Sequence, residues 1–544
     1  MYEYEFSLVD YKLREYEKIL AFKELKNIIG NINEKKLLNN KIKVKSVRKF
    51  PFEKIEDLTF FSNVKIKYNS KIINITPRQV GYELTSTFIK NNKNQMDLFN
   101  LYFLQNSHQK KTRQLRYLTH LMHEYKGRYN PQLCKSLINI SNIKKGSLVL
   151  DPFVGSGTTL VECVLNGYSS IGLDINPLAY LLTKTKVESL NLNFREFESQ
   201  INHIISRINK LKKGDKEYDL VEILNDKVFE RYLVDLDYLK KWFPIENLKN
   251  IFLILKEIFR FREEKIRNFL MIALSSILKS VSFQDPKQLR IKRISKDKVN
   301  NNVLDLFLND VIYFTNIIQL YQFCKPNFIN CEVKNYLGDI RHLRKRITLI
   351  DNTVDLIVTS PPYANALPYV DTDRLSLYLF GYVNRKSYRS LEGSLIGNRE
   401  IRKSERRKTE EYIINNYKKI LLPNDIKKLI FEIYYLNNEI NVGFRKKNTA
   451  ALLYKYFYDM KISMIEMYNV LKNNHYCYMV VGQNRTNAGG KSILIPTDDF
   501  IGLIGEEIGF KYIEKMPINV QPSYAIHKNN AIKDESILVF KKGR

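Results

Sequence analysis

The sequence predicts an α/β protein built on a doubly wound, mainly parallel sheet. Three observations lead to this fold class: short apolar strand patterns alternate with helical patterns, a glycine-rich turn at residues 151–159 joins a strand to a helix, and a second apolar strand ends at Pro361 and Pro362. The chain has 544 residues, and a soft prior of ~150 residues per domain therefore predicts several units.

Six segments follow one another in this interpretation. Residues 1–115 combine a helical pattern at Leu13–Ile29 with strand alternation at Val64–Tyr68, which predicts an N-terminal α+β accessory domain. The central sheet starts in residues 116–190, resumes in 331–384 and is completed in 450–544. Residues 191–330 predict an all-helical insertion, and residues 385–449 predict a polar, basic insertion.

Strand and helix patterns justify the three core segments. The expected elements, in order, are a helix at Pro131–Ile140, a strand at Ser147–Leu150, a helix at Thr158–Asn166, strands at Ser169–Leu173, Asp355–Val358 and Tyr476–Val481, a helix at Thr497–Gly509 and a strand at Ser536–Phe540. The helical insertion is predicted from amphipathic patterns at Phe194–Leu211, Leu248–Phe261, Ile266–Leu278 and Val303–Phe323.

Composition narrows the class of protein. With 44% hydrophobic and 12% aromatic residues, the chain is not expected to be wholly disordered. Lys and Arg number 88 against 58 Asp and Glu, and the net charge of +30 favours a polyanionic partner, with nucleic acid preferred to an anionic membrane surface. An AT-rich genome would also raise the Lys content, so the charge needs a second observation.

Compartment is predicted from the cysteines and the apolar segments. None of the five cysteines forms a C-x-x-C pair, so a disulfide framework and a thiolate zinc site are not expected. The acidic start at Met1–Glu5 does not resemble a signal peptide, and the uncharged stretch Phe269–Leu278 is about half of the ~20 residues that cross a membrane. We expect a cytoplasmic protein without a membrane span.

The segment Val149–Glu162 predicts a cofactor site. An apolar strand runs into Asp151, and the turn that contains Gly155 and Gly157 then starts a helix, so backbone amides face a ligand at the carboxyl edge of the sheet. A P-loop would need Lys after the last glycine, and a dinucleotide fingerprint would need glycine at position 160, where Leu stands.

Asp174 is the candidate ribose ligand. It ends the next predicted strand, about 20 residues after the glycine turn, where a carboxylate accepts hydrogen bonds from ribose hydroxyls. The alternative is a helix cap before Pro177.

The strand Asp355–Thr359 leads into Ser360-Pro-Pro-Tyr363, which predicts a site for an exocyclic amine. Because prolines lack N–H groups, the carbonyls of Ser360 and Pro361 are free to accept hydrogen bonds from such an amine, and Tyr363 offers a stacking surface. A plain Pro-Pro turn is the alternative interpretation.

Together, Asp151-Pro-Phe-Val-Gly-Ser-Gly-Thr-Thr159 and Thr359-Ser-Pro-Pro-Tyr363 resemble the amino-methyltransferase family of DNA methyltransferases. The segment His123–Leu133 is similar to the family segment over the methionine end of the cofactor, and Gly338-Asp339 is similar to the motif whose acid contacts adenine. The resemblance implies a Rossmann-like methyltransferase sheet and S-adenosyl-L-methionine as cofactor. It implies catalytic Ser360, Pro361, Pro362 and Tyr363, and cofactor-binding Lys126, Asp151, Pro152, Phe153, Gly155, Gly157, Thr158, Asp174 and Asp339.

The resemblance also implies the reaction. Ser-Pro-Pro-Tyr is more frequent among enzymes that methylate N4 of cytosine, so we expect a site-specific modification enzyme for double-stranded DNA in a restriction-modification system, with a separate cognate endonuclease as a possible partner. Adenine N6, an RNA base amine and a non-catalytic nucleic-acid-binding protein remain alternatives. A C5 mechanism would need a cysteine beside a proline, and the chain has none.

Three further features have competing interpretations. His120 and His123 have no third ligand nearby in the sequence, and no metal is expected. The basic run Lys287–Lys298 is either a solvated face or a phosphate-binding strip. The segment Arg385–Lys447 contains tyrosines among its basic residues, which favours target recognition over a merely exposed insertion.

Overall fold

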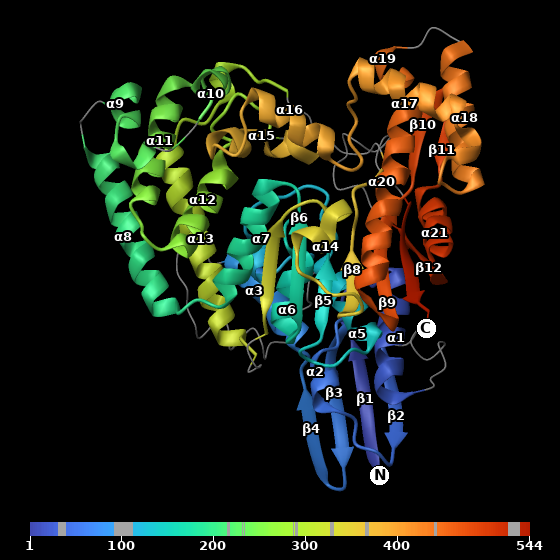
Figure 1. The fold of residues 1–544 in the computed structure, drawn as a ribbon. Helices are drawn as coiled ribbons and strands as arrows, with labels where there is room; N and C mark the ends of the chain where they lie inside the picture. Colours follow the sequence, from blue (N-terminus) through green and yellow to red (C-terminus); the bar gives the residue numbers. More distant parts are fainter. Residues whose placement is uncertain are drawn as a thin grey trace.

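The computed structural model describes residues 1–30, 40–91, 113–214, 218–230, 232, 234–286, 288, 292–326, 331–364, 369–439, 443–519 and 534–543. Its centre is a seven-stranded sheet in the order β12-β13-β9-β8-β5-β6-β7 (Figure 1). These strands are β5 (Leu148–Asp151), β6 (Ser169–Asp174), β7 (Val333–Leu337), β8 (Val354–Thr359), β9 (Leu471–Gly482), β12 (Phe510–Asn519) and β13 (Asp534–Lys542).

Strand direction identifies the doubly wound class. The neighbouring pairs from β9 to β7 are parallel, whereas β13 runs antiparallel to both β12 and β9. From β5 the chain continues to β6 on one side, and β8 lies on its other side. In open α/β sheets this reversal of strand order marks the edge at which ligands bind. The predicted fold class is confirmed.

Alternating strand residues build two cores. Leu150 and Ile357 pack with the helices α20 (Thr449–Val470) and α21 (Thr497–Ile508). Their neighbours Val149 and Leu356 face the opposite side and pack with α5 (Pro131–Ser141) and with N-terminal residues. The predicted buried strands are therefore covered on both faces, as a parallel sheet requires.

The helices α6 (Thr158–Asn166) and α7 (Pro177–Leu190) follow β5 and β6. Gly157 precedes α6 and Gly167 ends it, both in the left-handed region with φ of 85° and 74°. Asn176 caps α7 by accepting a hydrogen bond from the Leu178 backbone N–H, with Pro177 in the first turn.

The N-terminal region forms a four-stranded antiparallel sheet in the order β2-β1-β3-β4. Its elements are β1 (Tyr2–Leu8), α1 (Glu15–Ile29), β2 (Lys41–Ser46), α2 (Phe52–Glu56), β3 (Phe61–Tyr68), β4 (Lys71–Ile75) and α3 (Arg78–Asn91), followed by the 3-10 helix η2 (Leu118–Leu121). α1 packs against α5 and β12, and Tyr4 and Phe6 share a core with Val149. The N-terminal sheet thus shares its core with the central sheet.

The helical insertion lies between β6 and β7. Among its described residues the only β-structure is an isolated β-bridge between Gln284 and Arg293. Its elements are α8 (Phe194–Lys213), α9 (Leu220–Leu224), η3 (Lys227–Phe229), α10 (Leu236–Trp242), α11 (Ile245–Phe259), α12 (Glu264–Ile277), η4 (Lys296–Lys298) and α13 (Val303–Cys324). α13 is long and apolar enough to cross a membrane by length and composition alone. It packs instead against α8, α11 and α12 as a core helix.

After β7 come η5 (Ile340–His342) and α14 (Leu343–Arg346), and after β8 come α15 (Tyr369–Leu379) and α16 (Arg385–Ser394). α15 and α16 pack with the helical insertion through Leu377 and Tyr388. We name the remaining group the second lobe. It consists of α17 (Lys403–Asn415), η6 (Tyr417–Lys419), α18 (Asn424–Glu439), α19 (Phe444–Lys447), the part of α20 that packs against α17 and α18, and the hairpin of β10 (Asn484–Ala488) and β11 (Lys491–Ile495).

Figure 1 shows the helical insertion and the second lobe on opposite sides of one end of the sheet. The basic segment predicted at residues 385–449 is thereby divided, since α16 packs with the first group while α17 and α18 pack with α20. The six-part domain division itself stays a prediction.

Candidate functional site

The predicted motifs meet at the carboxyl edge of four adjacent strands. Asp151 ends β5, Asp174 ends β6, Gly338 and Asp339 follow β7, and Ser360 follows β8. The strand order β8-β5-β6-β7 makes these ends neighbours, although up to 209 positions separate Asp151 from Ser360 in the chain. The backbone N–H of Gly338 donates to the Asp174 carbonyl at 2.9 Å.

The glycine turn needs its glycines for different reasons. Gly155 and Gly157 have φ of 51° and 85°, a region that favours glycine. A Cβ on Gly157 would lie 2.9 Å from Thr183 Oγ1 and 3.1 Å from Thr183 Cα, so Gly157 lets the turn pack on α7. A Cβ on Gly155 would lie 3.5 Å from the Tyr125 ring, which therefore covers the turn.

Asp151 fastens the turn to the catalytic strand. Its carboxylate accepts hydrogen bonds from Thr159 Oγ1 at 2.5 Å, from Thr359 Oγ1 at 2.6 Å and from the Phe153 backbone N–H at 3.1 Å. Burial raises the pKa of Asp151 to about 6, against these hydrogen bonds. Pro152 and Thr158 are buried beside it. The carboxylate is buried and joins the turn to β8, so it can support a cofactor site by holding the turn in place.

Each carboxylate oxygen of Asp174 accepts a hydrogen bond from a backbone N–H. Gly155 N–H donates to Oδ2 at 2.9 Å and Asn176 N–H donates to Oδ1 at 2.8 Å. Burial raises the pKa of Asp174 to about 6, partly offset by these hydrogen bonds. A carboxylate has about four acceptor positions, so these backbone contacts leave acceptor capacity for ribose hydroxyls. The cap of α7 is Asn176 rather than Asp174.

Two residues that the motifs did not predict support Asp174. The Asn176 side chain donates to Asp373 Oδ2 at 3.0 Å, and Asp373 lies on α15. Burial raises the pKa of Asp373 to about 6, while Lys279 of the helical insertion opposes the shift. A small cavity of about 100 Å³ between α12 and α15 is bordered by His123, Lys279 and Asp373. The helical insertion is therefore linked to Asp174 through Asp373 and Asn176.

Asp339 and Lys126 are both engaged by charged neighbours. Arg341 Nε donates to both oxygens of Asp339 at 3.0 Å, and burial of Asp339 is outweighed by this hydrogen bonding, so its pKa is lowered. Lys126 pairs with Glu124. A contact from Asp339 to adenine would have to share its carboxylate with Arg341. In the segment around Lys126, Tyr125 is the side chain that covers the glycine turn.

The catalytic motif is held by residues from the far side of the sheet. Ser360 Oγ donates to the Val480 carbonyl of β9 at 3.1 Å, and the Tyr363 hydroxyl donates to Glu535 Oε1 of β13 at 2.9 Å. The Asn484 side chain donates to the carbonyl of Ala364. Residues 365–368, just after the motif, lie outside the described residues. Sequence patterns contain no signal for Glu535 or Asn484, because neither belongs to a local motif.

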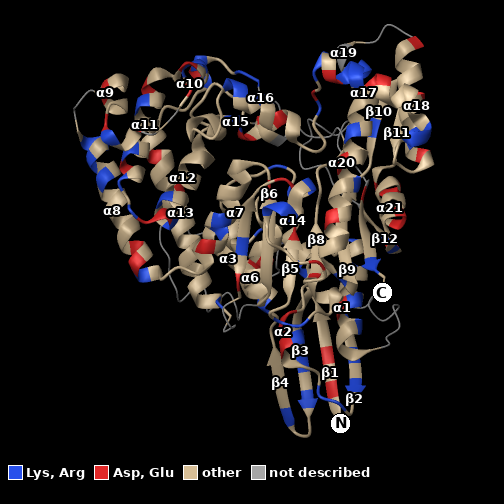
Figure 2. Ribbon diagram, viewed as in Figure 1, with Lys and Arg blue, Asp and Glu red and all other residues tan. Residues whose placement is uncertain are grey.

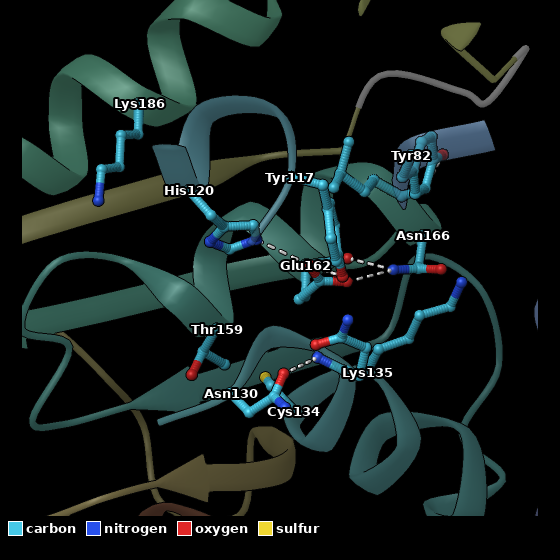
Figure 3. A network of polar contacts seen from close by, with 12 residues as sticks. Tyr82, Tyr117, His120, Asn130, Cys134, Lys135, Thr159, Glu162, Asn166 and Lys186 are labelled. Atoms are coloured by element: carbon cyan, nitrogen blue, oxygen red, sulfur yellow. Dashed lines mark hydrogen bonds and ion pairs between the residues drawn. The ribbon is translucent and has the colours of Figure 1, made fainter. Parts of the chain in front are cut away.

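A buried polar network lies beneath the glycine turn (Figure 3). Glu162 accepts hydrogen bonds from Tyr117 at 2.7 Å and Asn166 at 3.2 Å, and it contacts His120 Nε2 at 2.8 Å. His123 contacts Ser275 instead, so the two histidines considered for a metal have separate partners. Among the described residues no cluster of three or more His, Cys, Asp or Glu suits a metal ion.

The glycine turn also carries a polar group that suits a cofactor. Lys186, buried in α7, donates to the Ser156 carbonyl at 3.0 Å and fixes the turn from behind. Ser156 Oγ is buried and has no hydrogen-bond partner within the described part of the chain. Together with the open acceptor positions of Asp174, this hydroxyl is suited to a polar, ribose-bearing ligand.

Comparison with known proteins decides the family. A family model described as DNA methylase matches residues 8–185, which include the glycine turn and Asp174. Residues 8–185 thus match the DNA amino-methyltransferase family, and type II methyltransferases are similar to a larger part of the chain. This match begins at residue 8, so the similarity extends into the N-terminal region, which the sequence motifs alone left outside the resemblance.

Curated relatives include two type II methyltransferases. M.MvaI of Kocuria varians is 27% identical over 75% of this chain and 86% of its own length. M.BsoBI of Geobacillus stearothermophilus is 25% identical over 72% of this chain and 78% of its own length. A tRNA (guanine(10)-N2)-dimethyltransferase of Methanocaldococcus jannaschii is 32% identical over 19% of this chain and 25% of its own length.

The basic segments of the methyltransferase differ in exposure. Arg402 and Arg407 are exposed on the second lobe, whereas Arg406 is partly buried and lies 3.7 Å from Glu410. Lys287 and Arg290 lie outside the described residues. Arg293 lies over the rings of Trp242 and Phe283. Figure 2 shows Lys and Arg around α17, α18 and α19.

Proposed function

We propose that this methyltransferase modifies the exocyclic amine of a base flipped out of double-stranded DNA, and that the base is cytosine, methylated at N4. S-adenosyl-L-methionine is its cofactor and supplies an electrophilic methyl group on a sulfonium. The observation that carries the proposal is the place of Ser360–Tyr363 at the end of β8, joined to the glycine turn through the Thr359–Asp151 hydrogen bond.

Each part of the edge has a chemical task in this proposal. The glycine turn and Asp174 hold the ribose end of the cofactor, with Asp174 ionised. The carbonyls of Ser360 and Pro361 accept hydrogen bonds from the target amine, which localises the nitrogen lone pair that the ring otherwise withdraws. Tyr363 stacks on the flipped ring. No covalent bond between enzyme and base is needed. Burial raises the pKa of the Cys134 and Cys477 thiols, so neither is expected to act as a thiolate nucleophile.

DNA is proposed to lie across the second lobe. Gly397 packs directly on the motif, because a Cβ there would lie 2.8 Å from the Tyr363 carbonyl, and Asn484 of the hairpin contacts Ala364. The second lobe therefore starts at the proposed base pocket. Exposed Arg402, just before α17, and exposed Arg407, on α17, are suited to phosphate contacts. Target recognition by this lobe, and a cognate endonuclease for the same site, are part of the proposal.

Cytosine N4 is proposed over adenine N6 because the tetrapeptide begins with Ser. An RNA substrate is the second candidate, favoured only by the short similarity to a tRNA dimethyltransferase. The DNA enzymes M.MvaI and M.BsoBI match far more of the chain, including parts beyond the cofactor motifs.

The test is to express the protein in cells whose DNA lacks base methylation and to map modified bases by sequencing. We expect N4-methylcytosine at one recognition sequence, and no modification with Tyr363→Ala. Detection of N6-methyladenine at a single recognition sequence would show that the target base is adenine and would refute cytosine. An unmodified genome beside methylated RNA would refute DNA as substrate.

A further inference from the structure

Tyr363 of the catalytic motif has a partner that no motif contains. Its hydroxyl donates to Glu535 Oε1 at 2.9 Å, across 172 positions of sequence. Glu535 stands near the start of β13, the strand that runs antiparallel to its neighbours. Burial raises the pKa of Glu535, while the hydrogen bond from Tyr363 lowers it. Glu535 thus combines a partly buried carboxylate with a direct contact to the motif.

The backbone at Glu535 is held in place by several contacts. Its backbone pairs with Gly482 of β9. The next residue, Ser536, donates through Oγ to Asp498 Oδ2 at 2.8 Å, and Asp498 in turn pairs with Lys515 at 2.8 Å. The first residues of β13 are therefore held by the ladder on one side and by α21 and β12 on the other. A carboxylate on such a backbone has little freedom to follow a moving partner.

The backbone of the motif is held separately from its ring. Ser360 is tied to Val480, Asn484 holds the carbonyl of Ala364, and Gly397 packs on the carbonyl of Tyr363. None of these contacts restrains rotation of the tyrosine side chain about its two torsions. The hydrogen bond from the hydroxyl to Glu535 fixes the direction of the ring axis. Because a phenolic O–H prefers to lie in the plane of its ring, the position of the acceptor Oε1 also favours one ring plane.

We propose that Glu535 is a positioning residue that sets the plane of Tyr363 for stacking on the flipped base. The inference rests on the proposed function, in which Tyr363 is the stacking surface. A ring already in position loses no further side-chain freedom when the base arrives, so stacking contributes in full to holding the base. Without Glu535 the ring would keep its place in the chain and lose the restraint that this hydrogen bond supplies.

Methyl transfer to DNA by four variants tests this role: Glu535→Ala, Glu535→Gln, Tyr363→Phe, and Glu535→Ala combined with Tyr363→Phe. We expect Glu535→Ala and Tyr363→Phe each to lower kcat about tenfold, the scale of removing one hydrogen bond to a charged group. The double variant should be no slower than either single one, because both changes remove the same hydrogen bond. Glu535→Gln retains an acceptor oxygen and should restore most of the rate.

Two measurements separate positioning from general damage. Affinity for S-adenosyl-L-methionine, by calorimetry, should stay at the wild-type value in all four variants. Lys541→Ala, at the other end of β13, is the matched control and should leave kcat unchanged. A kcat within twofold of wild type in Glu535→Ala, or effects that multiply in the double variant, would overturn the proposal.

A readout without turnover keeps the inference separate from the proposed function. With 3-fluorotyrosine at position 363, the fluorine resonance should shift and change width in Glu535→Ala and stay in place in Lys541→Ala. If the wild-type protein methylates no DNA, the proposed function fails, and the fluorine spectrum still decides whether Glu535 holds the ring. An unchanged resonance in Glu535→Ala would reject the positioning role in either case.

Discussion

The proposed cofactor half and the proposed catalytic half of the carboxyl edge are built differently. In the cofactor half, Asp174 accepts hydrogen bonds from Gly155 and Asn176, which are 19 and 2 positions away. In the catalytic half, Ser360 and Tyr363 are held by Val480 and Glu535, which are 120 and 172 positions away. Both motifs are visible in the sequence, but contacts nearby in the chain hold the first, whereas the second is held by strands that are far away in the chain.

This difference predicts that the two halves respond to separate variants. Asp151 is the bridge between them, since it binds Thr159 of the turn and Thr359 of the catalytic strand. Changes on the cofactor side should alter binding of S-adenosyl-L-methionine, and changes on the catalytic side should alter turnover. The following variants test that separation, from the largest expected effect to the smallest.

Tyr363→Ala should lower kcat about a hundredfold, because stacking of one base contributes roughly 1 to 3 kcal/mol and the proposed amine pocket loses its wall. Ser360→Ala should cost only a few-fold, since its hydroxyl reaches only Val480 while the backbone carbonyls remain. Transfer of labelled methyl groups to DNA measures both. Tyr68→Ala, on the N-terminal sheet, serves as control. Full activity in Tyr363→Ala would show that the base does not stack on this ring.

Asp174→Ala should weaken binding of S-adenosyl-L-methionine at least tenfold, because charge-assisted hydrogen bonds contribute roughly 1.5 to 3 kcal/mol. At saturating cofactor the variant should keep most of its kcat. Calorimetry with Asp237→Ala, an exposed carboxylate on α10, as control gives the comparison. Gly157→Val should also abolish binding, since its Cβ would meet Thr183. Wild-type affinity in a folded Asp174→Ala protein would remove Asp174 from the cofactor site.

Cofactor affinity should fall as the pH falls. Burial raises the pKa of Asp174 to about 6, so the carboxylate that accepts ribose hydroxyls is ionised at pH 7.5 and largely protonated at pH 5.5. For a single group this predicts about fourfold weaker binding at the lower pH. Calorimetry measures the cofactor affinity of wild type and of Asp174→Asn at both pH values. Because the cofactor titrates equally in both experiments, the difference between the two proteins reports Asp174 alone. An equal pH dependence in both proteins would assign it to another group, such as Asp373.

The second lobe gives the smallest effect. Replacing Arg402 and Arg407 by Gln should reduce the slope of log affinity against log salt by up to ~1.8, about 0.9 for each phosphate that the protein no longer neutralises. Arg406→Gln is the matched control, because that side chain is partly buried beside Glu410 and should not change the slope. Fluorescence anisotropy with labelled DNA measures it. If the slope changes only with Lys292 and Arg293 neutralised, DNA lies on the helical insertion.

Sequence patterns predicted the order of core elements, and Asp151, Asp174 and Asp339, named as cofactor residues, lie together at the carboxyl edge; their roles stay predictions. Helix α6 has the predicted bounds, Thr158–Asn166, because the glycines at both ends are local signals. The covering Tyr125, the supporting Asp373 and the anchoring Glu535 were not predicted, since each acts only through contacts made by tertiary packing. Arg406 and Arg407 look alike in sequence, and only the packing of α17 separates the partly buried side chain from the exposed one.

Identification of the methylated nucleoside tests the central claim most directly. The protein is incubated with labelled S-adenosyl-L-methionine and unmodified double-stranded DNA, and the DNA is digested and separated by chromatography. The account predicts that the label elutes with N4-methylcytosine and is absent when Tyr363→Ala replaces the wild-type protein. Label in no DNA nucleoside, with transfer to RNA under the same conditions, would contradict it.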